Sequence, residues 1–187
     1  MKTIACIAGV LGFSVAFAVH PHAQPGGERF TATASIKSPT VTGSAPVIFQ
    51  INGFVSSADR DRLLAVVKRH KTTEIHDALN AMPDLGYVEL DGQQTPIKYA
   101  YAQATGGGRL ITVVTPKPIR HIGAHLPDAK SKKGYDLAFA LLILDANDHG
   151  DGEFAPAAKI KMDDKGAIVT EDYGPATVHL TGIAKTK

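Results

Sequence analysis

The sequence predicts an α+β fold, namely a mostly antiparallel sheet or open barrel with a two-helix insertion after the second strand. Apolar and polar residues alternate over most of the chain, and short turns rich in Gly, Asn and Asp separate the alternating stretches. Such turns favour antiparallel hairpins, because parallel strands need long crossover connections. Apolar residues recur at the three-to-four-residue spacing of a helix in one region only, which follows the second alternating stretch.

The first residues are typical of a secretory signal peptide covering residues 1–18. Lys2 gives a positive start, an apolar run follows, and Ala16 and Ala18 place small residues at the positions that a signal peptidase requires. We expect cleavage after Ala18, with Ala23 as the second choice; a retained N-terminal anchor is the alternative. Because the apolar run is too short for a comfortable span, the mature protein is expected to be periplasmic or secreted, with no membrane span.

Residues 19–29 then predict a flexible leader and residues 30–187 a single α+β domain. Cys6, the chain's one cysteine, lies in the signal, so the mature chain has no disulfide, thiolate nucleophile or Cys-ligated zinc. Removal of Lys2 leaves 19 of the 20 basic residues against 18 acidic ones, with no block of like charge. This balance gives no electrostatic support for binding nucleic acid or a membrane surface.

The first two strands are expected at residues 29–37 and 47–55, where apolar residues recur at every second position over much of each stretch. Residues 56–70 predict a helix that begins at the N-cap Ser56, with Asp59 three residues further on. A second helix follows from residue 72 and ends at Pro83. The rest of the chain predicts strands at residues 86–90, 97–103, 109–115, 135–145, 153–162, 167–171 and 176–183.

The stretch "DANDHGDGE", residues 145–153, is the strongest candidate for a cation site. Its oxygen-bearing side chains are those of Asp145, Asn147, Asp148, Asp151 and Glu153, which are the ligand types that Ca²⁺ prefers. The spacing resembles an EF-hand loop at its start and then fails, because His149 and Pro156 stand where two further ligands belong. The same residues are also those that tight turns require, so we expect a β-hairpin tip and keep a weak Ca²⁺ site as the alternative.

A second and weaker candidate is a zinc site at His121, His125 and Asp128. The histidines stand four residues apart, which on a helix places them on one face. Gly123 and the flanking prolines argue against that helix, and the Glu of a zinc-hydrolase motif is missing. The chain also lacks the nucleophile and phosphate-loop motifs that the common hydrolases and nucleotide enzymes carry, so no catalytic residue and no cofactor is predicted.

The C-terminal half resembles a group of uncharacterised secreted bacterial proteins. The resemblance is carried by "TPKPI" (115–119), "YDLAFALLILD" (135–145), "GDGEFAPAAKI" (150–160) and "VHLTGI" (178–183). It implies a hairpin between two strands and transfers no activity.

The function expected is that of an exported, non-enzymatic binding or assembly module with a protein or envelope partner. The alternatives are a Ca²⁺-stabilised envelope or adhesion module and a metal-dependent hydrolase. Candidate positions for an exposed apolar patch are Ile48, Phe54, Tyr99 and Tyr101. The oligomeric state is left open.

Overall fold

The strands and helices follow the predicted order and place both helices after the second strand. The structure is a computed structural model that describes residues 27–37, 42–69, 72–119, 134–173 and 178–186. The predicted signal peptide, most of the leader and His121, His125 and Asp128 lie outside these residues. The elements are β1 (Glu28–Lys37), β2 (Thr42–Ile51), α1 (Ser57–Val67), α2 (Thr72–Asn80), β3 (Gly86–Leu90), β4 (Gln93–Pro96), β5 (Tyr99–Thr105), β6 (Gly108–Thr115), β7 (Leu137–Asp145), β8 (His149–Met162), β9 (Ile168–Tyr173) and β10 (Val178–Thr186).

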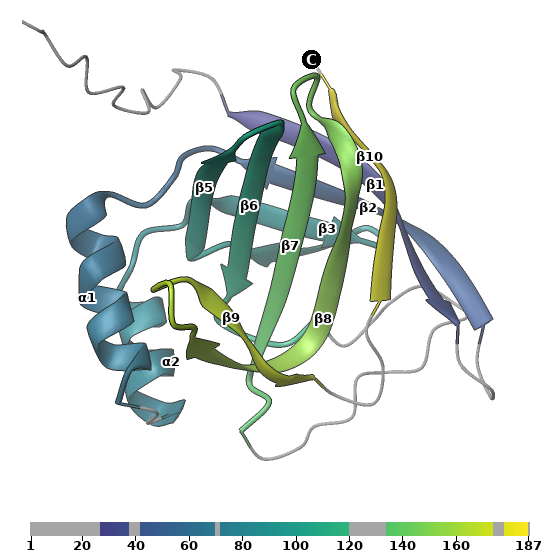
Figure 1. Cartoon of the computed structure of the whole chain (residues 1–187). Helices are drawn as coiled ribbons and strands as arrows, with labels where there is room; N and C mark the ends of the chain where they lie inside the picture. The colour runs from purple at the N-terminus through teal and green to yellow at the C-terminus, as the bar shows by residue number, and fades with distance from the viewer. Residues whose placement is uncertain (1–26, 38–41, 70–71, 120–133, 174–177, 187) are drawn as a thin grey trace, which may run out of the picture.

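Ten strands form one sheet in the order β4-β3-β2-β1-β10-β8-β7-β6-β5, and β9 pairs with β8 outside this order. Every pairing is antiparallel. The sheet curls into a half-barrel in which β5–β8 lie in front of β1–β3 (Figure 1). The α+β prediction is therefore confirmed in its broad form. In the described part of the chain, no helix is long and apolar enough to cross a membrane.

Apolar side chains form a core on each face of the β5–β8 half. The larger core fills the inside of the curl, where Phe49, Leu142 and Phe154 are almost fully buried. The second core lies between the outside of β5–β8 and the layer of α1, α2 and β9. The apolar run of residues 137–144 predicts a strand buried on both faces. Residues 137–140 of β7 are buried on both faces because they contribute to both cores, whereas Ile143 is exposed.

Both helices form where the sequence predicts them. Ser56 is the N-cap of α1, and its hydroxyl oxygen accepts a hydrogen bond from the backbone N–H of Asp59 at 3.1 Å. Leu63 and Val67 are buried on the inner side of α1, and Ile75 and Leu79 on that of α2. These helices therefore cover the outside of the sheet with the apolar stripes that the spacing predicts.

The structure corrects several of the predicted strands. The strand β2 covers Thr42–Ile51 rather than residues 47–55. The strand β1 begins at Glu28, inside the predicted leader. The short strand β4 was not predicted, because its four polar or proline residues show no alternation and it forms by pairing with β3. The strand β8 begins at His149 rather than Glu153, so two glycines that resemble turn residues belong to a strand.

These two glycines, Gly150 and Gly152, permit the curl of the sheet. A Cβ atom would lie 1.9 Å from the carbonyl oxygen of Ile143 at Gly150, and 2.2 Å from that of Leu141 at Gly152. No side chain fits at such separations, so β7 and β8 approach more closely here than other residues allow.

Candidate functional site

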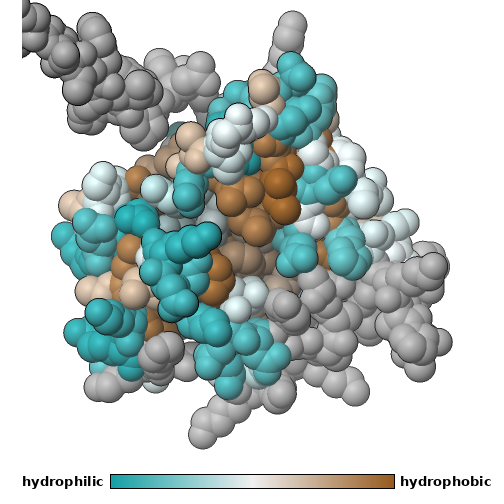
Figure 2. All heavy atoms as spheres, in the orientation of Figure 1, coloured by the Kyte–Doolittle hydropathy of each residue, from teal (hydrophilic) through white to brown (hydrophobic). Residues whose placement is uncertain are grey.

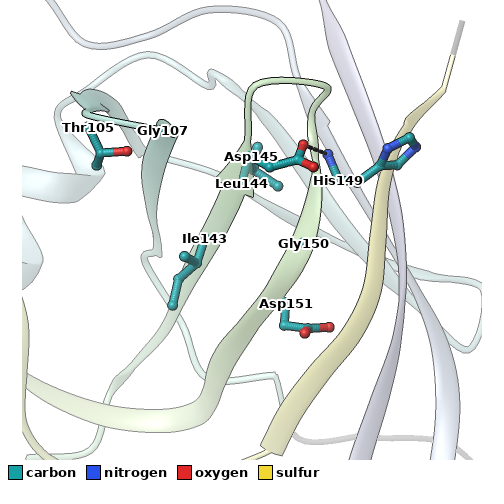
Figure 3. A pocket seen from close by; sticks show the side chains of 8 residues that line it. All are labelled: Thr105, Gly107, Ile143, Leu144, Asp145, His149, Gly150 and Asp151. Carbon is teal, nitrogen blue, oxygen red and sulfur yellow. Dashed lines mark hydrogen bonds between the residues drawn. The ribbon is translucent and has the colours of Figure 1, made fainter.

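The turn between β7 and β8 is built by the carboxylate of Asp145. Its Oδ1 accepts a hydrogen bond from the backbone N–H of Asn147 at 2.8 Å. The same oxygen accepts one from the backbone N–H of His149 at 2.9 Å (Figure 3). These bonds, that of His149 first, lower the pKa of Asp145 from its ordinary value. Asp148 adopts a positive φ of 61°, which Asp tolerates better than most residues. The predicted hairpin is confirmed, and Asp145 has a structural role in it.

Asp148 belongs to a network of four charged side chains at the same end of the sheet. The Arg109 guanidinium donates to both carboxylate oxygens of Glu28, at 2.9 and 3.1 Å, and its Nε donates to Asp148 at 2.9 Å. Lys185 Nζ lies 2.7 Å from Glu28 and 3.4 Å from Asp148. The charges of Arg109 and Lys185 thus balance those of Glu28 and Asp148. This pairing matters most for Glu28, which is only 7% exposed.

The pKa values of both basic groups reflect this pairing. Burial alone would lower the pKa of Arg109, but hydrogen bonds and charge attraction from Glu28 and Asp148 outweigh it and raise the pKa. The pKa of Lys185 is raised, chiefly by its hydrogen bond to Glu28. The network ties β1, β6, β10 and the β7–β8 turn together over the inner core.

The remaining two acids of the predicted Ca²⁺ loop lie further along β8. Asp151 and Glu153 are both exposed, and Asp151 Oδ1 accepts a hydrogen bond from the backbone N–H of Gly182 at 3.1 Å. Within the described ranges, no three His, Cys, Asp or Glu side chains gather closely enough to hold a metal ion. The five residues therefore share one hairpin without converging on one point, and Ca²⁺ binding stays a prediction.

The strand register places an apolar surface next to these acids. One row across the outside of β5–β8 runs Gln103, Leu110, Ile143, Asp151, and the next runs Tyr101, Thr112, Leu141, Glu153. We call these eight residues the open face. Each row begins on β5 with a polar, uncharged side chain, has an apolar side chain on β7, and reaches an acidic one on β8.

Ile143 is the most exposed part of this surface. Its side chain is 49% exposed, which makes it the most exposed large hydrophobic residue among those that the structure describes. The apolar atoms of this region lie bare between polar margins in the space-filling view (Figure 2). Above Ile143 lies a hollow of about 540 Å³ that is open to solvent and is lined by Thr105, Asp145, His149 and Asp151, among others (Figure 3).

The lower margin of the open face is formed by α1 and the β8–β9 turn. Arg60 of α1 lies over the ring of Tyr101, 4.6 Å from its centroid, and donates a hydrogen bond to the carbonyl oxygen of Gly166 at 3.1 Å. Beneath it Tyr99 is buried, and burial raises the pKa of its hydroxyl to about 12 although the nearby Arg60 charge opposes this.

Of the four positions expected for an apolar patch, the open face includes Tyr101 alone. Phe54 packs partly buried against the inner core, Ile48 is half-buried on β2, and Tyr101 is half-covered by Arg60. Leu110 and Ile143 were not singled out, because the sequence does not reveal how far the helices extend over the sheet. The ion-pair network was also missed, because its members are far apart in the chain.

No family model matches the chain, and neither a curated protein nor a solved structure matches it. The resemblance to secreted bacterial proteins therefore stays a prediction, and function has to be argued from the surface itself.

Proposed function

We propose that the chain is an exported, non-catalytic binding module, and that the open face is where it binds a polypeptide partner. The observation that carries the proposal is the half-exposed Ile143, which lies beside Leu110 on β6 and between Leu141 and Asp145 on β7. A bare apolar patch with a polar margin is typical of an interaction surface.

The energetics favour a partner at this position. Fully burying an isoleucine side chain contributes about 1.5 to 3 kcal/mol, so covering the exposed half of Ile143 contributes about 1 kcal/mol. The strands beneath are joined by continuous pairing from β5 to β8, so the surface is rigid and little ordering is required on binding. Export is supported by the signal-like residues 1–18.

Selection from a displayed library of random short peptides tests the proposal. The mature chain, residues 19–187, serves as the target, and enriched peptides are then measured against the Ile143→Lys variant. We expect affinity to fall by about tenfold or more, because a charge replaces the apolar centre of the surface.

Ile48→Lys provides the matched control. Ile48 is a half-buried isoleucine on the outer side of β2, away from the open face, so peptides that bind the open face keep their affinity. Peptides that bind wild type and Ile143→Lys equally, or a selection that enriches nothing, would show that the open face is not a binding surface.

A further inference from the structure

The charges around Ile143 indicate what kind of polypeptide fits there. On the open face, Asp151 is the cross-strand neighbour of Ile143, and Glu153 is the neighbour of Leu141. Asp145 lies two residues along β7 from Ile143 and is exposed on the wall of the hollow. Three carboxylates thus border one apolar centre.

The bases next to these carboxylates are histidines: His149 lies beside Asp145, and His179 of β10 is the cross-strand neighbour of Glu153. Within the residues that the structure describes, no Lys or Arg forms an ion pair with Asp145, Asp151 or Glu153. The one basic residue in β5–β7 is Arg109, whose guanidinium is committed to Glu28 and Asp148.

This local charge contrasts with the chain as a whole. The formal net charge of the full sequence is +2, yet the eight residues of the open face carry two negative charges and no positive one. On the margin, Arg60 is held over Tyr101 and pairs with Asp61 at 3.5 Å. An anionic partner would therefore be repelled by the acidic open face, whereas a cationic partner is attracted.

We propose that the partner of the open face is a polypeptide segment in which Lys or Arg side chains flank an apolar side chain. The apolar side chain covers Ile143 and Leu110, and the flanking cations lie against Asp151, Glu153 and Asp145. This inference rests on the proposed binding function and adds the chemical class of the partner.

Synthetic peptides of defined charge test the inference. The basic probe alternates Lys with Leu and Ile, the acidic probe replaces every Lys by Glu, and the polar probe replaces every Leu and Ile by Ser. We expect the basic probe alone to shift the NMR signals of Ile143 and Leu110. We also expect its binding to weaken as NaCl is raised from about 20 mM to about 500 mM, because surface charges are screened.

The double variant Asp151→Asn/Glu153→Gln removes the charges and keeps the shapes. The Asn still offers Oδ1 to the Gly182 N–H, so the fold is expected to persist. Affinity for the basic probe should fall about threefold to tenfold, since exposed ion pairs contribute about 0.2 to 1 kcal/mol each. The matched control is Asp77→Asn/Asp91→Asn, which neutralises two exposed acids on α2 and in the β3–β4 turn, and it should leave affinity unchanged.

The outcomes separate this inference from the binding function. Library peptides that lose affinity in Ile143→Lys but lack Lys and Arg, or that are insensitive to the charge-removing double variant, would overturn the cationic partner and leave the binding function standing. Stronger binding of the acidic probe would overturn it as well. If neither library peptides nor the basic probe bind, both proposals fail together.

Discussion

Arg109 joins parts of the chain that are 81 residues apart, because its guanidinium donates to both oxygens of Glu28. It also lies 5.6 Å from the centroid of the Phe30 ring, so its planar group covers the end of the inner core. Asp148 and Lys185 complete the network. The first strand is thereby fixed to the end of the sheet by charge as well as by hydrogen bonds.

The Arg109→Met variant should be destabilised by about 2 to 4 kcal/mol. Removal of the guanidinium leaves two carboxylates, those of the nearly buried Glu28 and the partly exposed Asp148. Lys185 is then their one cation in the network. Urea unfolding measures the effect, and the double variant Glu28→Met/Arg109→Met should recover much of the loss. As a control, Arg62→Met breaks an exposed pair with Asp59 and should cost less than about 0.5 kcal/mol. A loss as small for Arg109→Met would show that the network contributes little.

Tyr99 gives stability a pH dependence at alkaline pH. The pKa of its hydroxyl is raised from 10.0 to about 12 in the folded protein. The folded state therefore keeps a proton that the unfolded state loses between these values, so the contribution is complete below pH 10 and is lost as pH rises toward 12. The total is about 2 to 3 kcal/mol. Unfolding free energies measured across this range should fall less steeply for Tyr99→Phe, and parallel curves would contradict the assignment.

At the scale of elements, the close approach of β7 and β8 depends on positions without a side chain. The Cβ that alanine would add at Gly152 lies 2.2 Å from the Leu141 carbonyl oxygen and 3.2 Å from Ile183 Cδ1. We expect Gly152→Ala to reduce the free energy of unfolding by about 1 to 3 kcal/mol, since backbone has to move. Gly107→Ala is the control, because a Cβ there meets no atom within 4 Å. Equal stability of the two variants would mean that the curl does not require these glycines.

The elements that the sequence predicts correctly are those with local causes. The N-cap of α1 is made by Ser56 and Asp59, three residues apart, and the β7–β8 turn by Asp145 and the amides that follow it. Gly152 resembles a turn residue in the sequence, but it lies in β8. A glycine is required there because the backbone of the neighbouring strand β7 lies too close for a side chain. The same limit applies to Ile143: its apolar run, residues 137–144, predicts burial on both faces, but its exposure depends on where the helices stop covering the sheet.

At the scale of the whole molecule, two cores share one half of the sheet and leave part of it bare. The inner core is enclosed by the curl, whereas the outer core ends where α1, α2 and β9 end. The open face is the part of the outside of β5–β8 that this layer leaves bare or covers only partly, as where Arg60 of α1 lies over Tyr101. Its position follows from the length of the covering elements rather than from a motif, which is why no local pattern predicted it.

Thermal unfolding of the mature chain in EDTA, Ca²⁺ or Zn²⁺ decides what the acids of the β7–β8 hairpin do. A ligand that binds the folded state alone raises the midpoint as its concentration rises. Asp148 is paired with Arg109 and Lys185 and would have to leave these partners to bind an ion, whereas Asp145 uses Oδ1 for two backbone N–H groups and has only Oδ2 free. We therefore expect no Ca²⁺ shift at concentrations of about 1 mM, where weak extracellular sites fill. A Ca²⁺ shift lost in Asp151→Ala would instead make the hairpin a cation site. A Zn²⁺ shift lost in His125→Ala would support the site predicted at His121, His125 and Asp128, and with it the hydrolase alternative.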